Sequence, residues 1–299
     1  MKSLAILVLL LIAPFQAAAQ SYQGLWWNSP AGSESGWGLN ITHQGDILFA
    51  TWFTYDANGN GQWLVMPRAE LQPTMDDGMM DMDDMMGMMG NMMMPMQMPM
   101  YSGTLYRTTG PAFDAATFDP NAVTTTLAGY GTFTFSDYGN GSFDYVLDGV
   151  YGAKAITREA YSILPSCDFS DATTANFQDL WWRSGGTESG WGVNIAQEGD
   201  VIFATWFTYD ENGKGAWFVM PDTTKVGDMA YQGKIYRTTG PAVTSQKWSS
   251  TSVVATEVGT ASFAFSDASN GTFTAKVGAA TIVKPISRQL YASPASACR

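Results

Sequence analysis

The stretch ESGWGLNITHQGDILFATWFTYDANGNGQWLVMP, from Glu34 to Pro67, decides the fold, because it returns without a gap as ESGWGVNIAQEGDVIFATWFTYDENGKGAWFVMP, from Glu188 to Pro221. The match resumes downstream as LYRTTGPA at Leu105 and IYRTTGPA at Ile235. Solenoid repeats typically have about 20 to 50 residues, so a longer repeat in only two copies indicates two duplicated domains.

Within each copy, runs of aromatic and β-branched residues alternate with turn residues. In copy one the runs are GLWWN, GWGLNIT, DILFATWFTY, GQWLVMP, MYSGTLYRT, GYGTFTFSD, GSFDYVL and AKAITREAY. Short connections such as DANGNG (Asp56 to Gly61) are typical of hairpin turns. We therefore predict an all-β protein with two tandem antiparallel eight-stranded up-and-down barrels, or barrel-like sandwiches, at residues 20–162 and 163–299.

The first predicted strand carries the pattern Gly-x-Trp-Trp at Gly24, Trp26 and Trp27. In this respect each repeat resembles the avidin and lipocalin barrels, whose first strand carries a glycine and a tryptophan near the closed end. The resemblance implies a closed barrel. It does not imply a ligand, because no biotin-site or lipocalin loop motif accompanies it and copy two has Asp179 in place of Gly24.

The first 19 residues have the pattern of a secretory signal peptide. Lys2 precedes an apolar run from Leu4 to Ile12, and Ala17, Ala18 and Ala19 supply a small-residue cleavage site. The apolar run is shorter than the roughly 20 residues of a membrane-spanning helix. We therefore expect a periplasmic or secreted protein without a membrane span.

The net charge limits the kinds of binding partner, and the cysteine content predicts a disulfide. A formal net charge of -12 argues against nucleic acid, which would be repelled, and permits cationic partners. The two cysteines, Cys167 and Cys298, bracket copy two, and an oxidising compartment favours a disulfide between them. The alternative is a metal site of two thiolates, which lacks a nearby histidine.

Catalytic signatures are weak in this chain. Its single histidine, His43, corresponds to Gln197 in copy two, so no repeated acid–base chemistry rests on it. Asp56, with the asparagines that follow it, matches the first half of a calcium loop, but the glutamate at position twelve is missing and strands flank the turn. We expect plain hairpin turns and no enzymatic activity.

Repeated tryptophans give one candidate binding site. Most tryptophans should lie in the barrel cores, but aromatics at a barrel mouth suit a sugar or a small apolar ligand. The candidate ligand-facing residues are Trp37, Trp52, Trp63, Trp191, Trp206 and Trp217.

The second candidate is an insertion in copy one. The offset between the copies falls from 154 to 130 residues, so copy one carries 24 additional residues, which lie within MDDGMMDMDDMMGMMGNMMMPMQMPM (Met75 to Met100). This stretch contains most of the protein's 18 methionines, namely Met75, Met79, Met80, Met82, Met85, Met86, Met88, Met89, Met92, Met93, Met94, Met96, Met98 and Met100.

Glycine interrupts this segment repeatedly and bulky apolar partners are absent, so a buried helix is not expected. Thioether sulfur is a soft, uncharged ligand that favours Cu(I). The segment resembles the methionine-rich loops of periplasmic copper-handling proteins, although it lacks their histidines. We predict a disordered, Cu(I)-binding loop that stores, scavenges or delivers copper, with another exported copper protein as a possible partner. The alternatives that stay open are a reversible methionine oxidant sink, the small-ligand barrel and an inert disordered tract.

Overall fold

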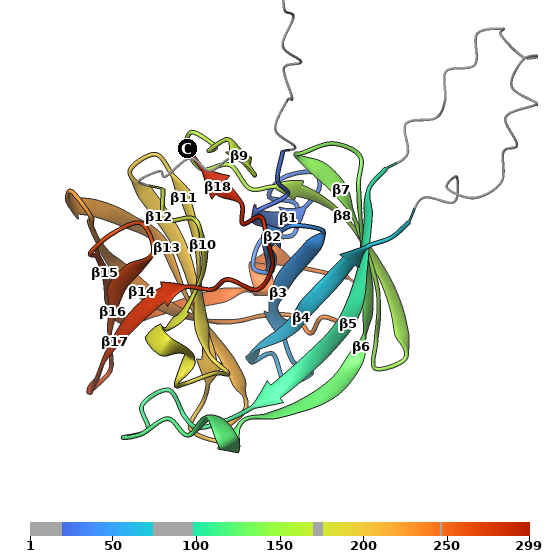
Figure 1. The fold of residues 1–299 in the computed structure, drawn as a ribbon. Helices are drawn as coiled ribbons and strands as arrows, with labels where there is room; N and C mark the ends of the chain where they lie inside the picture. Colours follow the sequence, from blue (N-terminus) through green and yellow to red (C-terminus); the bar gives the residue numbers. More distant parts are fainter. Residues whose placement is uncertain (1–19, 74–97, 170–175, 246) are drawn as a thin grey trace, which may run out of the picture.

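A computed structural model describes residues 20–73, 98–169, 176–245 and 247–299. This part of the chain forms two closed, antiparallel, eight-stranded barrels (Figure 1). The strands of the first barrel are β1 (Gly24–Asn28), β2 (Gly38–Gln44), β3 (Ile47–Tyr55), β4 (Gly61–Leu71), β5 (Met100–Thr109), β6 (Thr124–Phe135), β7 (Asn140–Leu147) and β8 (Val150–Arg158). Those of the second are β10 (Asp179–Arg183), β11 (Gly192–Glu198), β12 (Val201–Tyr209), β13 (Gly215–Gly227), β14 (Ala230–Thr239), β15 (Val254–Phe265), β16 (Asn270–Val277) and β17 (Ala280–Arg288).

Each strand pairs with the next one along the chain, and the last strand of each barrel pairs with the first. The predicted up-and-down barrels are therefore confirmed, and the two copies do not share a sheet. Among the described residues, the elements outside the barrels are a two-stranded sheet of β9 (Cys167–Asp168) and β18 (Ala297–Cys298) and the short 3-10 segments η2 (Pro120–Ala122), η3 (Ser184–Gly186) and η4 (Ser250–Ser252).

The turns follow from local chemistry. In the β3–β4 hairpin, the Asp56 carboxylate accepts backbone hydrogen bonds from Asn58 and Asn60, at 2.8 and 2.9 Å. Asp210 does the same in the second barrel. An aspartate side chain that accepts a hydrogen bond from the backbone two residues ahead forms an Asx-turn. This turn accounts for the DANGNG sequence without a bound calcium ion.

Side chains alternate between the inside and the outside of each barrel. In β6, Phe133 and Phe135 are buried while Thr132 and Thr134 are only partly buried, as the period of two predicts. Trp26, Trp52 and Phe143 complete a tightly packed interior with these phenylalanines. The second barrel repeats the arrangement around Trp181, Trp206 and Phe273.

The barrels meet through β3 and β4 of the first and β12 and β13 of the second. Phe53, Tyr55 and Trp63 pack against Phe207, Tyr209 and Trp217 in a buried cluster. The Trp63 indole N–H donates to the carbonyl of Thr208, and that of Trp217 donates to the carbonyl of Thr54. Because equivalent residues make equivalent bonds in both directions, this interface has approximate two-fold symmetry.

Each barrel also covers one end of the other. The loop between β5 and β6 places Phe113 and Phe118 against the core of the second barrel. The corresponding loop between β14 and β15 places Val243 and Trp248 against the core of the first. The two copies are thus separate in topology but exchange the loops that close their cores.

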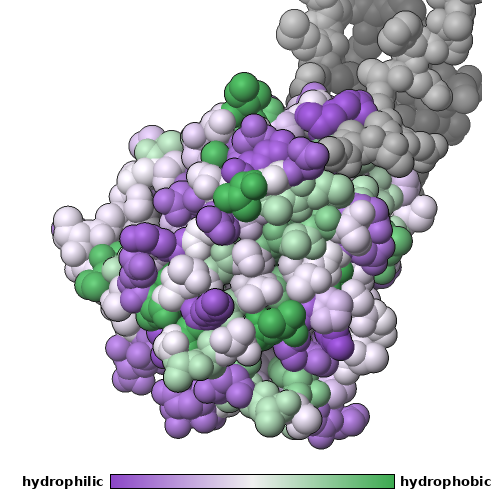
Figure 2. All heavy atoms as spheres, turned by 90° about the vertical axis from the view of Figure 1, so that its left-hand side faces the viewer, coloured by the Kyte–Doolittle hydropathy of each residue, from purple (hydrophilic) through white to green (hydrophobic). Residues whose placement is uncertain are grey.

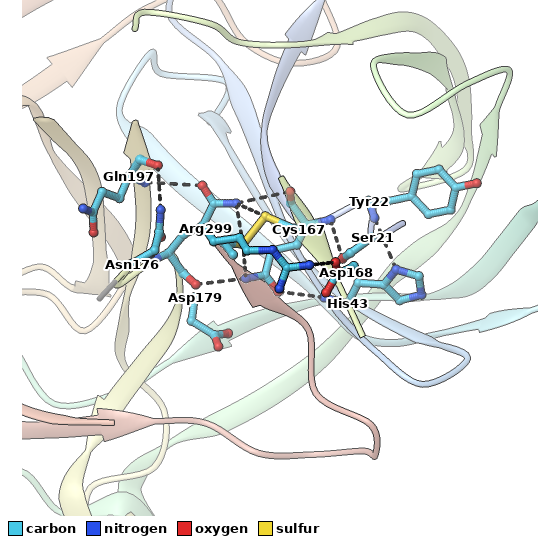
Figure 3. The surroundings of a disulfide bond; sticks show 12 residues. Ser21, Tyr22, His43, Cys167, Asp168, Asn176, Asp179, Gln197 and Arg299 are labelled. Carbon is cyan, nitrogen blue, oxygen red and sulfur yellow. Dashed lines mark hydrogen bonds and ion pairs between the residues drawn. A yellow bond between two sulfur atoms is a disulfide. The ribbon is translucent and has the colours of Figure 1, made fainter. Parts of the chain in front are cut away.

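The opposite end of the molecule contains the disulfide. Cys167 and Cys298 are bonded and pair β9 with β18, as the sequence predicted (Figure 3). The Ser21 amide donates to the Cys167 carbonyl, so the sheet also joins the first segment of barrel one. Gln23 and Gln178, one from each copy, donate their side-chain amides to the Cys298 sulfur.

The outer faces of the two barrels differ in polarity. Figure 2 shows the side on which β15, β16 and β17 lie, where hydrophilic and apolar residues are interspersed. On the equivalent face of barrel one, Tyr130, Val146 and Tyr151 form an exposed cross-strand row. Their counterparts in barrel two are Thr260, Lys276 and Thr281. In the part of the chain that is described, no helix is long and apolar enough to cross a membrane.

Candidate functional site

The methionine-rich segment belongs to the β4–β5 hairpin. At its base Leu71 pairs with Tyr101, and the Gln72 amide donates to the Met100 carbonyl at 2.8 Å. In copy two the equivalent hairpin is closed tightly, with Gly227 opposite Ala230. The hydrogen-bonded frame of barrel one is therefore complete on both sides of the insertion.

The predicted methionine ligands fall into two groups. Met98 and Met100 lie where the chain re-enters β5, and they are 54% and 43% exposed. Exposed thioethers at this position are accessible to a metal ion from solvent. The others, Met75 to Met96, lie outside the described residues.

The six candidate tryptophans are all buried. Trp63 and Trp217 serve the interface between the barrels, and Trp52 and Trp206 lie within the cores. The Trp37 and Trp191 indole nitrogens donate to the carboxylates of Glu34 and Glu188 at 3.0 Å. The aromatic set predicted to face a ligand therefore packs mainly against protein.

A repeated ion pair lies beside two of these tryptophans. Lys154 donates to Glu34 at 2.5 Å, and Lys284 donates to Glu188 at 2.7 Å. Each ammonium also lies over an indole ring, at 5.5 Å from the Trp37 centroid and 5.8 Å from that of Trp191. The glutamate and tryptophan of the repeated ESGW sequence thus hold a lysine from the last strand of the same barrel.

The mouth of barrel two has little free space. A cavity of about 10 Å³ lies among Trp191, Trp206 and Lys284, beneath Phe113 of the other copy. This volume corresponds to roughly one water molecule. The Phe113 ring packs edge-on against Trp206 and Phe218. A sugar would enter here only after this loop had moved away.

His43 and Gln197 perform the same structural task in the two copies. His43 Nδ1 accepts the Tyr22 amide, and its Nε2 lies 3.3 Å from the Tyr101 hydroxyl. Gln197 accepts the Phe177 amide through Oε1, and its Nε2 donates to the Tyr231 hydroxyl at 3.2 Å. Burial lowers the pKa of His43 to about 4, so the imidazole is neutral at physiological pH. Because Gln197 makes the equivalent two contacts in copy two, His43 has a structural role in connecting these groups.

The described residues include no group of three or more histidine, cysteine, aspartate or glutamate side chains arranged to hold a metal ion. Methionine thioethers are not among these ligand types, so this finding does not bear on a thioether site.

One charged group, Arg158, was not among the residues that the sequence singled out. It ends β8 and lies over the Trp26 ring, as Arg288 at the end of β17 lies over Trp181. The signal that could have found it is the exchange of Asp179 for Gly24. Both copies contain the arginine, but only copy two has an acid beside it, Asp179, where copy one has Gly24.

Comparison with known proteins adds no family assignment, because no family model, no curated protein and no solved structure matches this chain. The resemblance to avidins and lipocalins extends to the closed eight-stranded barrel and no further.

Proposed function

We propose that this protein binds Cu(I) through the methionine-rich segment, Met75 to Met100, and uses the paired barrels as a scaffold that holds the segment outside the core. The observation that carries the proposal is the comparison of the two hairpins. Copy two connects the equivalent strands without the insertion, so the barrel does not require it. A dense, non-random set of methionines at such a position is best explained by the chemistry of the thioether group.

Ligand chemistry favours copper over other ions. Thioether sulfur binds soft, monovalent copper, whereas Zn(II) and Cu(II) prefer imidazole, thiolate or oxygen ligands. The only histidine is buried and neutral, and both cysteines are in the disulfide, so neither supplies a competing site. Asp76, Asp77, Asp81, Asp83 and Asp84 add negative charge to the segment, which attracts cations.

Storage, scavenging and delivery remain three versions of this proposal. Delivery would need an exported copper protein as partner, and an exported setting is consistent with the disulfide. The small-ligand barrel is less favoured, since the cavity at the mouth of barrel two has a volume of about 10 Å³.

The test is an anaerobic Cu(I) titration in competition with a chromogenic chelator. The decisive variant replaces Gln72 to Met100 by Val226 to Ala230, the segment that occupies the same place between paired residues in copy two. We expect the variant to lose Cu(I) binding.

A matched control keeps every methionine and changes the five aspartates of the segment to asparagine. We expect this control to retain the Cu(I) stoichiometry of the unaltered protein. Full Cu(I) binding by the hairpin-replacement variant would refute the proposal. If the unaltered protein binds no Cu(I) but its methionines are oxidised and reduced reversibly, the oxidant sink takes its place.

A further inference from the structure

The internal duplication supplies a comparison between two arginines in equivalent places. Arg158 pairs with Trp26 across the β1–β8 seam, and Arg288 pairs with Trp181 across the β10–β17 seam. Their guanidinium carbons lie 5.4 and 5.1 Å from the centroids of these indole rings. Each cation is therefore placed by the same backbone pairing and the same aromatic face.

The partners of the two arginines differ. Arg288 forms an ion pair with the buried carboxylate of Asp179 at 3.0 Å. Its remaining donors bind the carbonyls of Asn176, Gln178 and Ala268. In this way Arg288 has a carboxyl partner and an acceptor for each of its three nitrogens.

Arg158 lacks both. It donates to the Ser21 carbonyl at 2.6 Å, and its buried Nε has no partner among the described residues. The residue equivalent to Asp179 is Gly24, and a Cβ atom there would lie 3.7 Å from Nη1 of Arg158. Within the described ranges, no carboxylate forms an ion pair with this guanidinium.

Glu159 and Glu198 do not supply the missing partner. Glu198 acts on Arg158 through space, but its carboxylate accepts the amides of Tyr161 and Ser162 at 2.9 and 2.5 Å. Burial raises the pKa of Glu159 to about 7, with a further contribution from Glu198, so Glu159 carries only part of a charge at neutral pH. A partly buried cation without a direct counter-charge is unfavourable, and an anion that reaches it recovers part of that cost.

Arg158 lines a cavity of about 260 Å³ at the disulfide end of barrel one. Tyr138, Leu164 and Pro165 give the cavity apolar walls, and Gln20, Ser21 and Ser166 add polar groups. This volume is slightly below the range of roughly 300 to 1,000 Å³ that holds drug-sized ligands. A site of this size with one cation and apolar walls suits a small organic anion.

We propose that this cavity binds a small organic monocarboxylate. The carboxylate would take the place beside Arg158 that the Asp179 carboxyl takes beside Arg288, and the apolar part would lie against Tyr138 and Leu164. Guanidinium is well suited to this role because its fork of N–H donors matches the two oxygens of a carboxylate. This proposal does not depend on copper binding.

The experiment is a ligand-observed NMR titration of the full protein with sodium benzoate, its neutral isostere benzamide and inorganic phosphate. We expect benzoate to bind at least about tenfold more tightly than benzamide, because a charge-assisted bidentate contact is worth about this factor or more. Phosphate, which has no apolar part, should bind more weakly than benzoate.

Two variants locate the site. Arg158→Gln should weaken benzoate binding about tenfold or more. Leu164→Trp, a change at a residue that is 43% exposed, should fill the cavity and weaken binding while leaving Arg158 in place. If Arg158→Gln does not fold, as judged by near-ultraviolet circular dichroism, Leu164→Trp and benzamide still decide the question. No benzoate binding by the unaltered protein, equal binding of benzamide or phosphate, or undiminished binding by a folded variant would each overturn the proposal.

Discussion

Trp63 and Trp217 make reciprocal hydrogen bonds across the barrel interface. The Trp63 indole N–H lies 2.8 Å from the Thr208 carbonyl oxygen, and the Trp217 indole N–H lies 3.0 Å from that of Thr54. Each indole therefore belongs to a strand of one barrel and donates a hydrogen bond to a backbone carbonyl of the other. Two tryptophans that repeat at equivalent positions in the sequence thus make specific contacts between the domains.

Trp63→Phe should lower the free energy of unfolding by about 1 kcal/mol more than Trp52→Phe. Both tryptophans are buried, but the indole nitrogen of Trp52 has no partner among the described residues. Its replacement loses packing alone, whereas the change at Trp63 also leaves the Thr208 carbonyl unpaired. Urea denaturation of both variants gives the comparison. Equal losses would show that the interface bond contributes nothing measurable.

Trp248→Ala should destabilise barrel one although Trp248 belongs to copy two. The indole packs on the core of barrel one, stacks on Tyr55 and donates to the Ser35 carbonyl at 3.1 Å. Since the side chain is only partly buried, we expect a loss of about 2 to 3 kcal/mol, below the usual cost of a fully buried tryptophan.

Hydrogen exchange followed by mass spectrometry shows where this loss falls. Protection should decrease in β1, β2 and β3 of barrel one. Val254→Ala, at a residue of copy two that is 55% exposed, serves as the control and should change neither barrel by more than about 0.5 kcal/mol. If the Trp248 variant instead loses protection only in barrel two, the exchanged loops are not coupled to the cores that they cover.

Replacing Cys167 and Cys298 together by alanine should lower stability by at most about 4 to 5 kcal/mol, the chain-entropy value for a loop of this length. The loss should extend to the start of barrel one, because the Ser21 amide donates to the Cys167 carbonyl. Urea unfolding with and without reductant measures it. An unchanged midpoint under reducing conditions, with free thiols confirmed, would contradict this expectation.

The sequence was sufficient for the fold because its signals are local and repeated. Phe133 and Phe135 alternate with threonines, Asp56 begins a hairpin turn, and the second copy repeats both patterns independently. The structure confirms the eight-stranded barrels that these patterns predict. It also confirms the pairing of Cys167 with Cys298, which was predicted from the presence of only two cysteines in an exported chain.

The exchanged loops and the pocket could not be predicted in the same way. Phe113 and Trp248 lie in irregular segments, where no periodicity indicates which core a side chain will cover. The environment of Arg158 depends on a residue 134 positions away, Gly24, and on the chain that closes over the disulfide. The exchanged loops follow from the docking of the two barrels, and the Arg158 environment follows from the closure of barrel one between β1 and β8. Neither leaves a local sequence pattern.

The copper proposal carries a prediction about pH. Thioethers have no proton to lose at physiological pH, so Cu(I) affinity should be nearly constant between pH 5 and pH 7, roughly the range over which a histidine site weakens. No single methionine should be essential, because many lie close together along the chain. Replacing Met98 and Met100 with leucine should therefore reduce stoichiometry by no more than one copper ion. A steep loss of affinity toward pH 5 would instead indicate a titrating ligand.

His43→Gln should remove one source of acid sensitivity while leaving the fold intact, because glutamine already fills the equivalent place at Gln197 with the same two partners. The pKa of His43 is about 4 in the folded protein, because of burial, against 6.5 in the unfolded chain. Between these values the unfolded state binds more protons, so His43 makes the protein less stable as pH falls from about 6.5 to about 4. The full effect is on the order of 3 kcal/mol.

Glu159 acts in the opposite direction. Burial raises its pKa to about 7, so its ionisation makes the protein less stable as pH rises from about 4.5 to about 7. The measurement is therefore the difference in unfolding free energy between His43→Gln and the unaltered protein across this range, because the Glu159 contribution is common to both and cancels. The difference should be small at pH 7 and should grow in favour of the variant toward pH 4. A difference that does not change with pH would show that His43 is not held neutral by its burial.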